Sequence, residues 1–282
     1  MYDRGVAPAV TRDDARRGIR DLGLADATVI AHSSLRSFGR VEGGADTIVD
    51  AFIDEGSTLV VPAFAAPIFA VEPPEGMRPE RNGYDYDDAH DAAGRSRIFT
   101  TDDNAISASM GAIPAAVLAR PERIRGNNPL CSFAGVGPRA DLIREQRPLD
   151  VYAPLRILAA RNGFALLIGV GLERMTLIHL AEERAGRTLF RRWANAADGK
   201  PMEVEVGSCS DGFGRLEPVL GPLARETIVG RSRWRAFPAR AVVDVAADAI
   251  RADPGITDCG SPDCRRCGDA IAGGPTGNDH SS

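Results

Sequence analysis

Residues 164–186, FALLIGVGLERMTLIHLAEERAG, join an apolar run to a glycine turn and a helical stretch. The run FALLIGVG (164–171) predicts the most deeply buried strand of the chain, and residues 172–186 predict the helix that follows it. Strands and helices alternate on either side of this unit, which indicates an α/β fold. Ligands of α/β sheets bind at the carboxyl ends of strands, so we expect a functional site where the 172–186 helix begins.

The rest of the chain supplies similar units. Thr11 is the predicted N-cap of a first helix, because acidic residues follow it in the first turn. We expect one compact domain over residues 1–272 and a disordered tail over 273–282. Strands are predicted at 27–34, 57–64, 129–137, 202–208 and 233–237, and helices at 11–24, 43–56, 109–120, 154–163 and 239–253.

Residues 65–108 lack clear periodicity, and about 44 residues are too many for an ordinary connection. We therefore expect a long inserted loop with a function or small elements of its own. Nine acidic residues and four arginines give it a net charge of −5, which suits a polycationic ligand and also an ordinary solvated loop.

The composition excludes several classes of protein. The 282 residues, 44% of them hydrophobic, suffice for one sizeable core, but they contain no apolar run of membrane-spanning length. The net charge of −5 argues against binding to nucleic acid or to an anionic membrane. The N-terminus has no signal-peptide pattern, so we expect a cytoplasmic protein.

His179 lies in the helical stretch, with Glu182 and Glu183 at the i+3 and i+4 positions. Either carboxylate is close enough on a helix to accept a hydrogen bond from the imidazole. Such a pair fixes the tautomer of the ring and can serve as a general base. The alternative is a core histidine beside two surface glutamates, and spacing alone leaves both readings open.

Six stretches along the chain form a recognisable series, and the motifs HSSLxSFG and TxxHxAE are the most specific parts of it. The stretches are VIAHSSLRSFGRVEGGADTIVDAF (29–52), STLVVPAF (57–64), SMGAIPAAVLARP (109–121), NPLCSFAGVG (128–137), PLRILAARNGFALLIGVGLERMTLIHLAE (154–182) and VGSCSDGF (206–213). Together they resemble the aminoglycoside 3-N-acetyltransferase family, also called the antibiotic N-acetyltransferase family. The resemblance covers most of residues 10–270 and implies a single domain of a distinct α/β fold, different from that of the GNAT acetyltransferases.

The resemblance implies acetyl transfer from acetyl-CoA to an amine of an aminoglycoside, with the 3-amine as the expected position. It makes His179 the general base, Glu182 the carboxylate that orients it, and Thr176 the residue near the developing oxyanion. The turn after residues 27–34 precedes a helix, and such turns can present backbone N–H groups to an anion. The implied CoA contacts are His32, Ser33, Ser34, Leu35, Arg36, Ser37 and Phe38, with Ser109 and Phe133 in addition.

The acceptor side departs from the family pattern. Asn128 stands where the family commonly has histidine, and Met175 stands for asparagine before the threonine. Another small amine is therefore the alternative acceptor. The expected acceptor contacts are Asp85, Asp87, Asp88, Asn128 and Glu183.

The stretch CGSPDCRRC (259–267), within a cysteine-rich segment at 254–270, has the spacing C-x4-C-x2-C. C-x2-C is a familiar zinc-ligand spacing, and four thiolates complete a closed structural site. We expect a structural zinc ion bound by Cys259, Cys264 and Cys267, with Cys209 as fourth ligand, against free thiols as the alternative. Cys131 lies outside this set, and two further hypotheses remain: Cys131 as a covalent nucleophile, or a zinc-bearing binding protein without activity.

Overall fold

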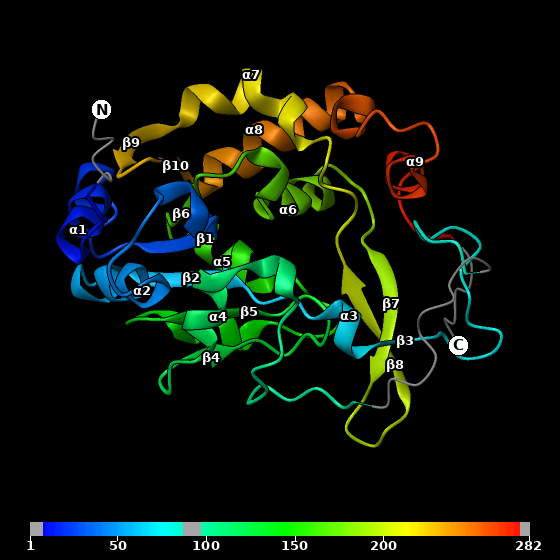
Figure 1. The fold of residues 1–282 in the computed structure, drawn as a ribbon. Helices are drawn as coiled ribbons and strands as arrows, with labels where there is room; N and C mark the ends of the chain where they lie inside the picture. The colour runs from blue at the N-terminus through cyan, green and yellow to red at the C-terminus, as the bar shows by residue number, and fades with distance from the viewer. Residues whose placement is uncertain (1–7, 87–96, 277–282) are drawn as a thin grey trace, which may run out of the picture.

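The computed structural model describes residues 8–86 and 97–276. Within these ranges the chain forms a seven-stranded mixed sheet with helices on both faces (Figure 1), which confirms the predicted α/β class. From one edge to the other the strands are β4 (Ile124–Arg125), β5 (Phe133–Val136), β2 (Thr58–Pro62), β1 (Thr28–Ser33), β6 (Phe164–Ile168), β10 (Ser232–Pro238) and β9 (Arg225–Val229).

The middle of the sheet is parallel. β1 pairs in parallel with β2 on one side and with β6 on the other, whereas β5 and β10 extend the sheet with antiparallel pairs. The three central strands are almost completely buried, because helices cover both faces. Their carboxyl ends therefore meet at one edge of the sheet, where the residues that follow β1 and β6 come together.

Two hydrophobic clusters lie on opposite faces of the sheet. One contains Ile19, Ile48 and Ile113 from the helices α1, α2 and α4, and the other contains Leu155, Ile178 and Val242 from α5, α6 and α8. The bounds are α1 (Arg12–Asp21), α2 (Ala45–Asp54), α4 (Ala112–Leu118), α5 (Ala153–Ala160), α6 (Leu177–Arg184) and α8 (Ala239–Ala252).

A second sheet of three short strands packs beside the main one and has its own apolar cluster. It consists of β3 (Ala70–Val71), β7 (Phe190–Asn195) and β8 (Pro201–Val206). Sequence periodicity did not reveal β7, since its buried residues do not alternate regularly with exposed ones. The remaining elements are α3 (Ala66–Phe69), α7 (Glu217–Leu220), α9 (Arg265–Ile271) and the 3₁₀ helices η1 (Leu35–Phe38), η2 (Ala108–Met110), η3 (Ala140–Glu145), η4 (Leu172–Arg174), η5 (Phe213–Leu216), η6 (Gly221–Leu223) and η7 (Pro254–Thr257).

Thr11 caps α1 as predicted. Its hydroxyl accepts a hydrogen bond from the Asp14 backbone N–H, and the Asp14 carboxylate accepts one from the Thr11 backbone N–H. This reciprocal pair is a capping box, which satisfies two helix-terminal donors. The cap begins α1 at Arg12, and the helix packs against α2.

The helix predicted over 172–186 is interrupted. η4 ends at Arg174, Met175 is extended with ψ of 92°, and α6 begins at Leu177. The Met175 side chain is fully buried, so core packing holds the break in place. The prediction of a single helix was therefore wrong, and the break brings Thr176 to the N-terminus of α6.

The stretch 65–108 carries small elements, as expected: α3, β3 and the start of η2, while its residues 87–96 lie outside the described residues. Two other expectations need correction. Gly111, with φ of 87°, separates η2 from α4 where one helix was expected over 109–120. The predicted tail is bound through residue 276, since Thr188 N donates to Gly273 O and Thr276 N to Arg81 O. Among the described residues, no helix has the length and apolar character that crossing a membrane requires.

Candidate active site

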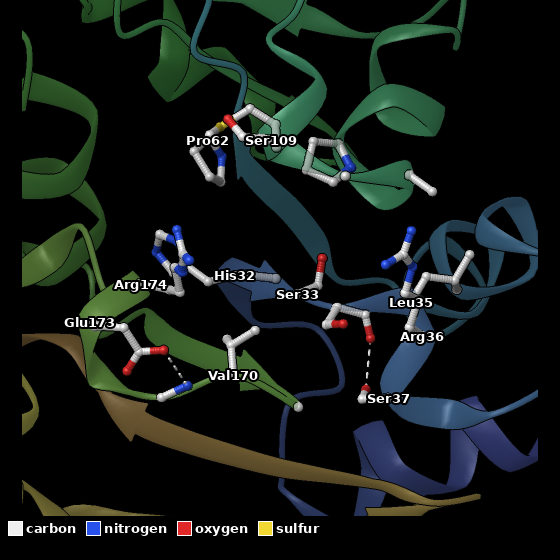
Figure 2. A pocket seen from close by; sticks show the side chains of 18 of the residues that line it. His32, Ser33, Leu35, Arg36, Ser37, Pro62, Ser109, Val170, Glu173 and Arg174 are labelled. Carbon is white, nitrogen blue, oxygen red and sulfur yellow. Dashed lines mark hydrogen bonds between the residues drawn. The ribbon is translucent and has the colours of Figure 1, made fainter. Parts of the chain in front are cut away.

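A cleft of about 1380 Å³ opens at the carboxyl edge of the parallel strands. The residues after β1 and β6, the segment 108–114 and the N-terminus of α6 line it. Figure 2 shows His32, Ser33 and Arg36 on one side of the hollow and Ser109 across from them. The cleft therefore lies where α/β sheets bind ligands.

His179 projects from α6 to the wall of this cleft. Its Nδ1 lies 2.7 Å from Glu182 Oε2, which is the i,i+3 pairing, and the residue is 8% exposed. The hydrogen bond assigns the Nδ1 proton to this contact in the neutral ring. Nε2 has no hydrogen-bond partner among the described residues and is left as the basic nitrogen.

Glu182 has two further partners, both missed by sequence reasoning. Arg187 Nη1 donates to Glu182 Oε1 at 2.5 Å, and Ser208 Oγ donates to Oε2 at 2.7 Å. Burial alone raises the pKa of Glu182, but the hydrogen bond and charge of His179, with Ser208 and Arg187, together lower it below its usual value. Glu182 is therefore an anion that holds the imidazole through Nδ1.

Aromatic rings and a glycine fix the His179 ring in place. Tyr152 stacks parallel to it at 6.1 Å between centroids, and Phe213 meets it edge-on at 4.8 Å. A Cβ on Gly207 would lie 2.5 Å from the Tyr152 hydroxyl and 2.8 Å from His179 Cδ2, so only glycine fits there. The ring is thus held on three sides.

His32, at the end of β1, is the second histidine of the cleft. Its Nε2 accepts a hydrogen bond from the Thr176 backbone N–H at 3.3 Å. Burial first, and then the positive charges of His179 and Arg174, lower the pKa of His32 to about 3. His32 therefore stays neutral over the working pH range, with its proton on Nδ1.

Most of the expected CoA contacts line the cleft. Phe38 does not, since it is buried edge-on against Trp234, and Phe133 is fully buried behind Phe64, which does line it. Five arginines also line the cleft, and three of them, Arg36, Arg174 and Arg231, form no ion pair within the described ranges. The expected residues at the wall are His32, Ser33, Ser34, Leu35, Arg36, Ser37 and Ser109.

None of the expected acceptor contacts that the structure describes lines the cleft. Asp85 forms an ion pair with Arg265 at 2.5 Å, and Asp87 and Asp88 lie outside the described residues. Glu183 pairs with Arg156 at 3.0 Å and lines a different cavity between α5, α6 and α8.

The Asn128 side chain holds neighbouring backbone segments together. It is fully buried, its amide donates to two backbone carbonyls, and its oxygen accepts from the backbone N–H groups of Leu130 and Cys131. Glu173, which no sequence pattern singled out, is the one carboxylate among the described residues that line the cleft. It accepts a hydrogen bond from Gly171 N at 3.2 Å (Figure 2).

The four predicted metal ligands come together from distant parts of the sequence. The Sγ atoms of Cys209, Cys259, Cys264 and Cys267 all lie within 4.8 Å of one another. Four thiolates at about 2.3 Å from a zinc ion would lie about 3.8 Å apart, so the cluster fits a tetrahedral site. Cys131 lies apart from it, and burial raises the pKa of the Cys131 thiol to about 12.

Comparison with known proteins agrees with the fold and with the resemblance read from the sequence. The family model described as aminoglycoside 3-N-acetyltransferase matches residues 30–251. Aminoglycoside N(3)-acetyltransferase VII of Streptomyces paromomycinus is 32% identical over 269 residues, which cover 83% of this chain and 89% of that protein. Aminoglycoside N(3)-acetyltransferase IX of Micromonospora chalcea is 34% identical over 191 residues, which cover 62% of this chain and only 63% of that protein.

Solved structures share the architecture. A variant of aminoglycoside acetyltransferase AAC(3)-IVa in complex with a gentamicin superposes with a TM-score of 0.75 at 23% identity, covering 96% of this chain and 100% of that one. AAC-IIIb in a binary complex with CoASH has a TM-score of 0.67 at 19% identity, covering 87% and 97%. At these identities the likeness establishes the fold, which differs from the GNAT fold as expected.

Proposed function

Because the chain belongs to the aminoglycoside 3-N-acetyltransferase family, we propose that it transfers the acetyl group of acetyl-CoA to the 3-amine of an aminoglycoside. The observation that carries this proposal is the His179–Glu182 pair at the wall of the cleft. One nitrogen of the ring is committed to the carboxylate, and the other is left to take a proton.

The reaction is a direct attack. As the amine nitrogen bonds to the thioester carbonyl carbon, His179 Nε2 accepts the proton that the nitrogen loses, which is worth about 10² to 10⁴ in rate. The tetrahedral intermediate then collapses, the C–S bond breaks, and the same proton passes to the CoA sulfur. The products are the amide and CoASH. The Thr176 hydroxyl is the proposed donor to the oxyanion, since Thr176 lines the cleft and its backbone N–H is already bonded to His32.

The co-substrate fits the serine- and arginine-lined side of the cleft. Ser33, Ser34 and Ser37 offer hydroxyls, and Arg36 and Arg231 offer cations for the phosphates of CoA. The binary complex of AAC-IIIb with CoASH, on the same fold, supports CoA as the co-substrate. A covalent route through Cys131 is disfavoured, because its thiol does not line the cleft and its raised pKa keeps it protonated.

The acceptor is assigned from the family and from the gentamicin complex of AAC(3)-IVa. Glu173 is the carboxylate placed to meet an ammonium group in the cleft. Another small amine is the second candidate acceptor. Asp85 and Glu183, two of the carboxylates expected to contact an aminoglycoside, form ion pairs with arginines instead.

The test is an acceptor screen with acetyl-CoA, followed by mass spectrometry of the products. We expect an aminoglycoside with a free 3-amine to gain one acetyl group, and a matched analogue that lacks this amine to gain none. Faster acetylation of a non-sugar amine would favour the second candidate. Failure to consume acetyl-CoA with every amine would overturn the proposal.

We propose further that Cys209, Cys259, Cys264 and Cys267 bind one structural zinc ion. Metal analysis of protein purified without added zinc should give one ion per chain, and a metal-free protein of full stability would contradict this. We propose the cytoplasm as the location, because a reducing compartment keeps thiolate ligands of zinc from oxidation.

A further inference from the structure

The cysteine cluster is connected through the chain to the partners of the Glu182 carboxylate. Two chain segments connect them: residues 207–212, which follow β8, and residues 254–259, which include η7. Each segment carries one cysteine of the cluster, and each also supplies or anchors a partner of Glu182. The two segments lie side by side (Figure 1), with η5 against η7.

The first connection is a single peptide bond long. Ser208 donates to Glu182 Oε2 at 2.7 Å, and the next residue, Cys209, belongs to the cluster and is 3% exposed. Gly207, on the other side of Ser208, lies against the His179 ring. The position of Cys209 therefore sets the position of the Ser208 hydroxyl.

The second connection runs through Arg187. Its guanidinium, bonded to Glu182 Oε1, also donates to Thr257 Oγ1 at 2.8 Å and to the Pro254 carbonyl at 2.5 Å. Thr257 precedes Cys259 by two residues. The segment 254–259, which ends at Cys259 of the cluster, thus orients the Arg187 guanidinium.

The two segments also contact each other backbone to backbone. A Cβ on Gly212 would clash with the carbonyl oxygens of both Thr257 and Asp258, so the two backbones pack without an intervening side chain. In the described chain, no disulfide joins the segments, so the four thiols are the one place where a strong bond could link them.

We propose that a zinc ion bound by the four thiolates clasps these two segments and thereby positions Ser208 and Arg187 on Glu182, so that metal occupancy sets the alignment of the His179–Glu182 pair. This inference rests on the proposed function for its kinetic consequence. The outer partners of a functional group are positioning residues, and losing one typically costs about 10- to 100-fold in activity.

The kinetic test removes the metal from the wild-type enzyme with a chelator and then restores it with zinc chloride. We expect kcat to fall about tenfold or more and to recover, while the KM for acetyl-CoA stays within about twofold, because residues 33–37 lie on other elements. Cys264→Ser should show the same loss without recovery. The matched control is Cys131→Ser, which should retain both the metal and the rate.

A double-mutant comparison separates positioning from general stability. In Ser208→Ala, metal removal should reduce kcat by a clearly smaller factor than in wild type, because part of the coupling is already absent. Equal factors in the two proteins, or an unchanged kcat in metal-free wild type, would overturn the proposal.

A readout without catalysis distinguishes this inference from the proposed function. The proton between His179 Nδ1 and Glu182 gives a downfield proton NMR signal, which His179→Gln identifies by its loss. We expect the signal to disappear on metal removal and to return with zinc. A metal-dependent signal in a protein without acetyl transfer would contradict only the proposed function. Acetyl transfer with a signal and a rate that do not depend on the metal would contradict only the proposed link between zinc and the His179–Glu182 pair.

Discussion

Strand β1 and helix α6 each bring one histidine to the same cleft, and the two rings have different partners. His179 is 8% exposed and shares a proton with Glu182, whereas His32 is 5% exposed and accepts from a backbone N–H. Their burial is nearly equal, so the feature that distinguishes the two rings is the partner: a carboxylate on His179 and a backbone N–H on His32. A carboxylate partner suits the proposed base, because it stabilises a positive charge on an imidazole.

No carboxylate among the described residues offsets the effect of burial on His32. Its lowered pKa, about 3, keeps it uncharged beside a ring that has to gain charge during the reaction. A second cation there would oppose protonation of His179. One cleft therefore holds a neutral histidine bonded to a backbone N–H and a carboxylate-paired histidine, which is the proposed base.

The largest expected effect tests the paired ring directly. His179→Ala should lower kcat by about 10² to 10⁴, because the amine then loses its proton to water. Circular dichroism should show the fold intact. A kcat within about threefold of wild type, measured at saturating acetyl-CoA, would remove the proposed base from the mechanism.

The next effect concerns the carboxylate. Glu182→Gln should lower kcat by about 10- to 100-fold, since the amide cannot stabilise the imidazolium. It should also lower the free energy of unfolding by about 3 kcal/mol, because Arg187 is left buried without its counterion. Urea denaturation measures this loss, and an unchanged midpoint would show that the Arg187–Glu182 pair contributes little.

The sequence alone could indicate this pair but not its surroundings. The i,i+3 and i,i+4 spacing alone made both Glu182 and Glu183 candidates. The family resemblance pointed to Glu182, and the structure shows that its carboxylate contacts His179 whereas Glu183 pairs with Arg156. Arg187 and Ser208 reach Glu182 through the end of a helix and a loop of the second sheet, and no local spacing encodes such contacts. In VGSCSDGF the cysteine fits a metal-ligand pattern, whereas nothing in the local sequence marks Ser208 as a partner of Glu182.

The fold shows the same division. Long apolar runs such as 57–64 and 164–171 predicted the central strands, because burial on both faces leaves a continuous hydrophobic signal. The break at Met175 left no such signal, since a buried methionine also suits a continuous helix. Clustering of Cys209 with the three late cysteines was expected from ligand number, and the tertiary fold brings them within 4.8 Å.

A smaller expected effect concerns His32 and is measured as the pH dependence of the free energy of unfolding. The pKa of His32 is about 3 in the fold and about 6.5 in the unfolded chain, so the unfolded chain binds more protons between these values. Stability is therefore complete above pH 6.5 and falls as the pH decreases toward 3, by up to about 1.4 kcal/mol per pH unit. Unfolding of wild type and His32→Gln should show a difference in free energy that shrinks over this range. A difference that does not change with pH would contradict the neutral assignment.

The smallest effect distinguishes the two neighbouring glutamates. Glu183 pairs with Arg156 in a half-exposed ion pair, and solvent screens such pairs, so Glu183→Gln should cost no more than about 1 kcal/mol in unfolding free energy. Its kcat and both KM values should stay within about twofold of wild type, because the side chain faces the cavity between α5, α6 and α8 and not the cleft. Steady-state kinetics of Glu183→Gln and Glu182→Gln measure this, because the two variants carry the same substitution at adjacent positions. An equal loss of kcat in both variants would mean that net charge near α6, and not the contact at His179 Nδ1, supports the base.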